Sequence, residues 1–120
     1  MVEQDIRTWL IANTSLESAQ VHFTRALQGT TPPYAVISRV SGTWYDTHDG
    51  PTGTADGVWQ VSVFGETLGQ VKAISADVYG LHGADVNNTG RIQQVSETDL
   101  YEQDAGMYQI AHRFLVQYYV

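Results

Sequence analysis

The stretch that decides the fold is Val58-Trp59-Gln60-Val61-Ser62-Val63-Phe64. Its bulky apolar residues alternate with polar ones, which is the period of two expected of a strand with one buried face. An earlier stretch, residues 34–40, is rich in β-branched and aromatic side chains, and the preceding Pro32-Pro33 favours an extended chain. The two stretches are therefore expected to pair as a hairpin.

After Gly65 the apolar period changes from that of a strand to that of a helix. Thr67, with Gln70 three residues later, has the pattern of a capping box, and Gly83 stands where a left-handed C-terminal cap is expected. The apolar residues between these signals recur at helical spacing: Leu68, Val71, Ile74, Val78 and Leu81. The sequence predicts a helix that begins after Thr67 and ends before Gly83.

The connection between the two strands, residues 42–56, is much longer than an ordinary hairpin loop. It contains three carboxylates and neither Lys nor Arg. Connections of this length are usually functional or disordered, and the aromatic residues Trp44 and Tyr45 argue against plain disorder. We predict a long polar loop whose two aromatics anchor an interface, in preference to stacking on a ligand or packing on their own domain.

The chain begins with an amphipathic helix that ends near Asn13, because Val2, Ile6, Trp9 and Leu10 share one face. A second capping box, Thr14 with Glu17, leads into residues 15–20. Residues 21–27 fit either a continuing helical face or a short alternating strand. We predict a short helix followed by a short strand.

The last third of the chain is predicted to hold two strands joined by an acidic segment. Residues 91–95 form a short strand, and residues 96–106, with four carboxylates and no base, form an exposed connector. Residues 107–120 are the most regular strand of the chain, because their even-numbered members form one apolar face. Burial of those side chains contributes about 1.5 to 3 kcal/mol each.

The length of this terminal strand bears on assembly. A straight strand over residues 107–120 runs roughly 48 Å, whereas a compact chain of this size has a diameter of roughly 35 Å. The strand must therefore bend strongly or be covered by another copy, because long uncovered edges invite pairing. We expect an oligomer on this ground.

Composition indicates a single globular domain over residues 1–120, with 42% hydrophobic and 16% charged residues. Thirteen Asp and Glu against six Lys and Arg give a net charge of −7. Such a chain does not bind nucleic acid by neutralising phosphates, although acidity also serves solubility alone. No apolar run approaches a membrane span, and the acidic start lacks the pattern of a secretory signal, so a cytosolic origin is the default.

Few residues suggest chemistry. With zero cysteines, disulfides, thiol catalysis and Cys-ligated zinc are excluded. The cluster Asp46-Thr47-His48-Asp49 offers metal-ligand side chains, but it lacks a second ligand group at a defined spacing, and Asp49-Gly50-Pro51 favours a turn. His22, His82 and His112 are scattered, and no phosphate-binding loop or hydrolase motif is present. We therefore predict neither an enzyme nor a metal or cofactor site.

In the order of its motifs, the chain resembles the tail completion, or tail terminator, proteins of long-tailed bacteriophages and gene transfer particles. The resemblance covers most of the chain, although His22 stands where an apolar residue is expected. The motifs that carry it are Ile6-Arg7-Thr8-Trp9-Leu10, Thr31-Pro32-Pro33-Tyr34-Ala35-Val36-Ile37-Ser38-Arg39-Val40-Ser41-Gly42, Asp49-Gly50-Pro51-Thr52-Gly53, Val61-Ser62-Val63-Phe64-Gly65, Asp99-Leu100-Tyr101-Glu102 and Tyr108-Gln109-Ile110-Ala111-His112-Arg113-Phe114.

This resemblance implies an α+β subunit, with helices on one face of a mainly antiparallel sheet of four or five strands. It further implies a structural virion protein of a siphovirus-like tail, assembled in the host cytoplasm. Copies would form a hexameric ring that closes the head-proximal end of the tail tube and meets the neck or head-completion proteins. DNA would pass through the ring without specific binding, and no membrane is involved.

On this interpretation the ring contacts come from two places. The predicted loop supplies Trp44, Tyr45, Asp46, His48, Asp49 and Asp56, and the terminal strand supplies Phe114, Val116 and Tyr118. The three aspartates are expected to face a partner or an acidic channel that lets DNA slide. A neck or head-completion protein of the same virion is the alternative function, and a small metal-dependent hydrolase or ligand-binding domain is a remote one.

Overall fold

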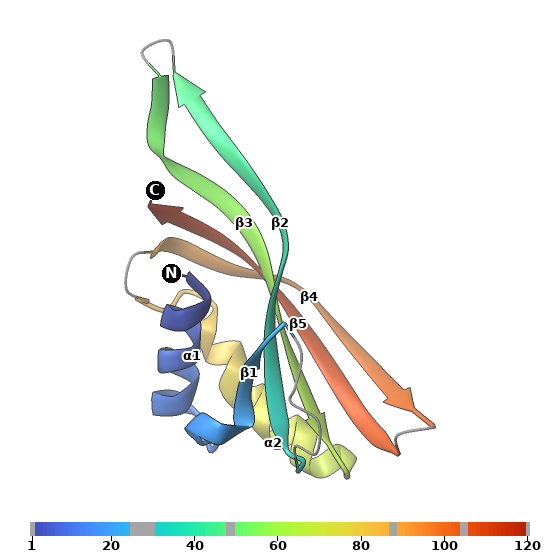
Figure 1. Ribbon diagram of the computed structural model, residues 1–120. Helices are drawn as coiled ribbons and strands as arrows, with labels where there is room; N and C mark the ends of the chain where they lie inside the picture. Colours follow the sequence, from blue (N-terminus) through green and yellow to red (C-terminus); the bar gives the residue numbers. More distant parts are fainter. Residues whose placement is uncertain (1, 25–30, 48–49, 87–88, 104–105, 120) are drawn as a thin grey trace.

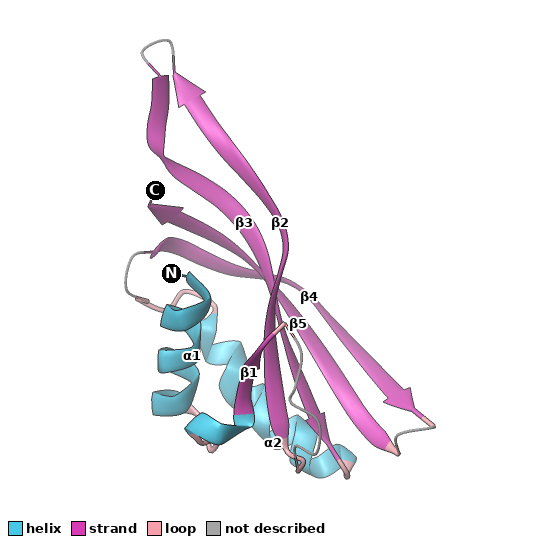
Figure 2. Ribbon diagram, in the orientation of Figure 1, coloured by secondary structure: helices cyan, strands magenta, loops and turns pink. Residues whose placement is uncertain are grey.

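The computed structural model describes residues 2–24, 31–47, 50–86, 89–103 and 106–119; at residues 42–47, 50–55, 102 and 119 it describes the backbone alone. Two α-helices pack against a five-stranded sheet, with short 3-10 helices before the first strand and after the second α-helix (Figures 1 and 2). In chain order the elements are α1 (Val2–Asn13), η1 (Ser18–Gln20), β1 (Val21–Phe23), β2 (Tyr34–Thr47), β3 (Gly50–Gly65), α2 (Leu68–Val78), η2 (Tyr79–Leu81), β4 (Thr89–Glu102) and β5 (Met107–Tyr119).

The strands lie in the order β1-β2-β3-β5-β4. All neighbours pair antiparallel except the short β1, which runs parallel beside β2. Both α-helices lie on the same face of the sheet (Figure 2). The expected α+β fold with a mainly antiparallel sheet is therefore confirmed.

The core lies between this face and the helices. Trp59, Val61 and Val63 of β3 are almost fully buried there. The alternation predicted for the terminal strand is also confirmed, because β5 buries its even-numbered residues from Ile110 to Tyr118 on the same side. One apolar face per strand is what a sheet covered by helices on one side requires.

The N-terminal helix has its predicted bounds and buries Val2, Ile6 and Leu10. Its Arg7 side chain donates hydrogen bonds to the carbonyl oxygens of Ser18, at 2.7 Å, and Val21, at 3.3 Å. These bonds tie α1 to η1 and to the start of β1. The expected short helix followed by a short strand is confirmed.

The second capping box lies three residues later than predicted. The Thr14 hydroxyl instead donates to the carbonyl of Leu10, at 2.6 Å. The reciprocal cap is formed by Glu17 and Gln20 around η1. A Thr hydroxyl can bond back to the preceding turn as well as cap a following one, and the sequence pattern does not distinguish these two uses.

The N-cap and the left-handed glycine predicted around the second helix are confirmed. Thr67 is the N-cap of α2, and its hydroxyl accepts from the backbone N–H of Gln70 at 3.2 Å. The helix tightens into η2 after Val78, and Gly83 has φ of 74°. Glycine adopts this left-handed conformation without steric cost, so the chain turns here toward β4.

The predicted long polar loop over residues 42–56 is wrong. Strands β2 and β3 continue to pair as far as Thr47 opposite Gly50. On its other side β3 is paired with β5 up to Thr54 opposite Tyr119. Backbone hydrogen bonds hold this part of the ladder, and they leave no alternation of apolar and polar residues for the sequence to reveal.

The predicted acidic connector over residues 96–106 is also wrong. β4 does not stop at Val95 but continues to Glu102, which pairs with Met107. Its side chains from Val95 to Tyr101 are exposed, as expected. This outer part of β4 is exposed apart from surface contacts such as that of Asp99 with Lys72, so it needs no apolar face and its composition resembled that of a connector.

The terminal strand needs neither a bend nor a second copy. β5 lies between β3 and β4 of its own chain, and the molecule is elongated, with extents of 52 × 27 × 24 Å. The argument for an oligomer from β5 therefore fails. The premise that long uncovered edges invite pairing applies instead to the strands at the edges of the sheet.

Candidate functional site

Two long hairpins extend beyond the helix layer in opposite directions. The β2–β3 hairpin projects at one end of the molecule and the β4–β5 hairpin at the other (Figure 1). Each hairpin contributes one strand with an outer side, β2 and β4 respectively. Edge strands present unpaired backbone N–H and C=O groups, so these two strands are the candidate assembly surfaces.

The outer side of β4 is covered only near its start. There the backbone N–H of Gly83 donates to the Ile92 carbonyl at 2.9 Å, and the backbone N–H of Gln94 donates to Nδ1 of His82 at 3.0 Å. The His82 ring is in turn stacked on Tyr79, with ring centroids 5.6 Å apart. A β-bulge follows at Val95, where the pairing with β5 shifts register.

Beyond that bulge, no strand among the described residues pairs with the outer side of β4. The side chains there include large apolar groups that face solvent. Val95 is 51% exposed, Leu100 49% and Tyr101 52%. Tyr101 also contacts the ring of Tyr108 at 4.6 Å between centroids.

The outer side of β2 has the same organisation. Its first part is covered by β1, which pairs Val21 to Phe23 with Ala35 to Ile37. The backbone N–H of Thr24 then donates to the Ile37 carbonyl at 2.8 Å, closing this cover. A bulge follows at Val40, which is 44% exposed. From Ser38 to Thr47, no described strand pairs with this outer side.

The face of the sheet opposite the helices combines polar side chains with apolar ones such as Tyr34, Val36 and Phe64, and it carries little net charge. Arg113 donates to the Gln60 side-chain oxygen at 3.0 Å, and the Gln60 amide donates to the Ser62 hydroxyl at 2.8 Å. On β3, β4 and β5 the charged side chains described on this face are Asp56, Arg91 and Arg113. We call it the helix-free face.

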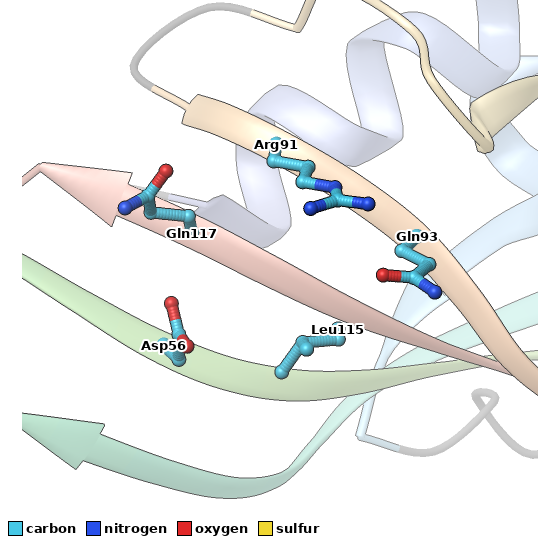
Figure 3. Close-up of a pocket in the computed structure, with 5 residues that line it drawn as sticks. All are labelled: Asp56, Arg91, Gln93, Leu115 and Gln117. Atoms are coloured by element: carbon cyan, nitrogen blue, oxygen red, sulfur yellow. The ribbon is translucent and has the colours of Figure 1, made fainter.

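A shallow pocket of about 210 Å³ lies on the helix-free face (Figure 3). Its lining combines opposite charges with two amides and one apolar side chain, and it is formed by Asp56, Arg91, Gln93, Leu115 and Gln117. Asp56 and Gln117 are direct partners across β3 and β5. The pocket is open and mostly polar, so it suits a surface contact better than an enclosed ligand.

The environment of His112 shifts its titration. It lies on the core face of β5 at 1% exposure, with Nδ1 3.1 Å from the Gln94 amide nitrogen. Burial lowers its pKa below 6.5, while the carboxylates of Glu97 and Asp99 act in the opposite direction. A neutral packed histidine is a structural residue here.

The described residues contain no group of three or more His, Asp or Glu side chains placed to hold a metal ion. Within the same part of the chain, no helix has the length and apolarity to cross a bilayer.

Comparison with known families identifies the kind of protein. The family model of tail completion protein gp17 matches residues 4–119. The chain belongs to this family. As a tail completion protein it is a structural protein of the bacteriophage virion, located in the tail, where it assembles with other virion proteins.

The fold of this tail completion protein also occurs among solved structures. A chain in the virion of a native gene transfer agent particle superposes with a TM-score of 0.73 at 19% identity, covering 99% of this chain and 95% of that one. No curated protein sequence matches the chain significantly.

The predicted ring contacts fall into three groups in this tail completion protein. Trp44, Tyr45 and Asp46 lie in the distal part of β2, with their backbone alone described, and His48 and Asp49 lie outside the described residues. Asp56 lies on the helix-free face, in the pocket of Figure 3. The third group, Phe114, Val116 and Tyr118, is buried in the core of its own chain, with exposures of 0%, 0% and 9%.

These positions leave the predicted contacts untested, yet they show what sequence reasoning missed. The open outer side of β4, with Leu100 and Tyr101, did not figure among the candidates. The one available signal was this pair of large apolar residues within an otherwise acidic segment. Apolar side chains there indicate a surface covered by something other than the chain's own helices.

Proposed function

We propose that copies of this chain form a ring, hexameric as in the resemblance noted above, that closes the head-proximal end of the tail tube. The ring stops polymerisation of the tube protein and presents a surface to the neck or head-completion proteins. Family membership supports the location in the tail. The observation that carries the ring is the pair of open strand edges on opposite sides of one sheet.

In this ring the helices lie outside and the helix-free face lines the channel. The physical reason is that a ring has a larger circumference on its outer side than on its inner side. The outer side therefore has more room for the layer of helices. The helix-free face offers amides, hydroxyls and apolar groups, with Asp56, Arg91 and Arg113 as its described charges on β3, β4 and β5. Without a dense cluster of bases, DNA passes through it without being held by its phosphates.

The proposed role is structural, with residues 1–120 acting as one domain and without catalysis or a cofactor. Asp46, in the distal part of β2, and Asp49, outside the described residues, are proposed to contact the tube or a neighbouring copy. Asp56, which lines the same pocket as Arg91, is proposed to face the channel.

The test is an assembly assay with purified components. Tail tubes grown with the protein should have a fixed length and carry a ring at one end in electron micrographs, whereas tubes grown without it should continue to lengthen. Tubes of unchanged length distribution would contradict the proposal. In parallel, binding to purified portal complexes without binding to tubes would assign the chain to the neck instead.

A further inference from the structure

We propose that neighbouring copies join by adding the distal part of β4 of one copy to the distal part of β2 of the next. The sheet would thereby become continuous around the ring. This inference rests on the proposed ring and names the partner of its open edges, a second copy of this chain. The two edge segments are defined as Ser96 to Glu102 on β4 and Ser38 to Thr47 on β2.

The first argument is strand direction. The strands β2, β3, β5 and β4 alternate in direction across the sheet, because each neighbouring pair is antiparallel. An even number of alternating strands leaves β4 antiparallel to β2. Rotation about a ring axis keeps this relation, so the new pair between copies is antiparallel and forms the well-aligned hydrogen bonds of that ladder.

The second argument is that both edges are open over the same kind of segment. On β2 the cover by β1 ends at Ile37, and on β4 the cover by His82 and Gly83 ends at Gln94. A bulge follows each cover, at Val40 and at Val95. Bulges bend a strand and increase its twist, so each open segment turns away from its own subunit.

The third argument is the offset between the open segments. Within one copy Tyr101 is level with Tyr108 and Gly65, next to the start of β2. Pairing Tyr101 with Val40 of a neighbour displaces the copies by roughly six residues, or about 20 Å. Across four strands about 4.8 Å apart, this displacement corresponds to a tilt of about 45°, close to the 35–45° at which barrels close.

The fourth argument is the direction of backbone groups, which alternates along a strand. The outward bonds made by Ile92 and Gln94 imply that, after the bulge, the backbone N–H and C=O groups of Glu97, Asp99 and Tyr101 point outward. The same alternation on β2 starts from the outward carbonyl of Ile37. It directs the backbone N–H and C=O groups of Gly42 and Trp44 outward. Several registers match the two sets, and the one that also brings Tyr101 against Val40 places Asp99 opposite Gly42.

In this register Leu100 lies opposite Ser41, and Tyr101 lies opposite Val40. The pairing covers the three half-exposed apolar side chains Val40, Leu100 and Tyr101, exposed by 44%, 49% and 52%. It leaves the helices of both copies on one side of the continuous sheet, because Ser41 and Leu100 both belong to the helix-free face. The apolar patches thus gain a partner without any change within the subunit.

The test uses the absence of cysteine from the chain, which removes any background thiol. The variant Ser41→Cys with Leu100→Cys places one thiol on each open segment, at a non-hydrogen-bonded pair whose Cα separation suits a disulfide. The control is Ser41→Cys with Ala76→Cys, because Ala76 is exposed on α2, away from both edges. Both variants are introduced into complete particles, oxidised mildly and run on non-reducing gels.

The edge variant should give a ladder of covalent oligomers ending at the copy number of the ring, and the control should remain monomeric. Monomer in the edge variant, from particles whose tails contain the protein, would overturn strand addition and leave the tail function standing. Equal ladders in both variants would also overturn it. Failure of the tube-length assay would instead refute the proposed function.

A second variant tests the backbone. Asp99→Pro removes an outward N–H, at an edge position where proline is tolerated, while Asp99→Ala keeps that N–H and removes the 3.3 Å contact with Lys72. Folding should survive in both, and ring formation should be lost in Asp99→Pro alone. Rings from folded Asp99→Pro, or their loss in Asp99→Ala as well, would count against the pairing.

Discussion

A substitution at Phe114 tests whether this residue belongs to the core or to a contact between copies. The sequence predicts Phe114 as a candidate ring contact. The structure buries its side chain completely between the sheet and the helices. Truncation of a fully buried phenylalanine to alanine costs about 3 to 5 kcal/mol, from lost burial and from the cavity left behind. A chain of this length has a total stability of roughly 6 to 18 kcal/mol, so Phe114→Ala removes a large part of it.

The assay is urea and thermal unfolding at a protein concentration where light scattering shows monomer. The melting temperature of Phe114→Ala should fall by about 10 to 20 °C, at about 4 °C per kcal/mol for this size. The control is Phe23→Ala, because Phe23 on β1 is 37% exposed and its truncation should cost clearly less. A variant that unfolds normally as a monomer but no longer assembles would refute the core assignment.

Two further perturbations test the packing and the titration of the core. In Gly57→Ala the added Cβ would overlap the Trp59 ring, so this variant should lose about 1 to 3 kcal/mol in urea unfolding. Gly69→Ala, on α2 with open space around it, should gain about 0.5 to 1 kcal/mol. A neutral Gly57→Ala would contradict the close contact. Because burial lowers the pKa of His112 below 6.5, this side chain takes up a proton at a higher pH in the unfolded chain than in the folded one. The contribution of neutral His112 to stability should be complete above pH 6.5. It should decline below that pH, by up to about 1.4 kcal/mol per pH unit until the lowered pKa is reached. Urea titrations at several pH values should show this slope in the wild type and a reduced slope in His112→Leu, and equal slopes would exclude His112 as the cause.

Local patterns determined much of the fold. Val58 to Phe64 and the even-numbered residues of β5 alternate because one face of each strand packs against helices, and this burial is written directly into residue type. Thr67 and Gly83 likewise mark the region of α2 and η2, because a cap depends on the chemistry of single residues. The family, too, was recognisable from the order of short motifs.

Tertiary structure alone decided the distal parts of β2, β3 and β4. These segments are held by backbone hydrogen bonds to neighbouring strands, and such bonds are nearly independent of side-chain identity. Residues 42–47 and 96–102 therefore resembled a loop and a connector, although they extend two hairpins. The two open edges follow from strand order and from where β1, His82 and Gly83 end their cover, which are relations between segments distant in sequence.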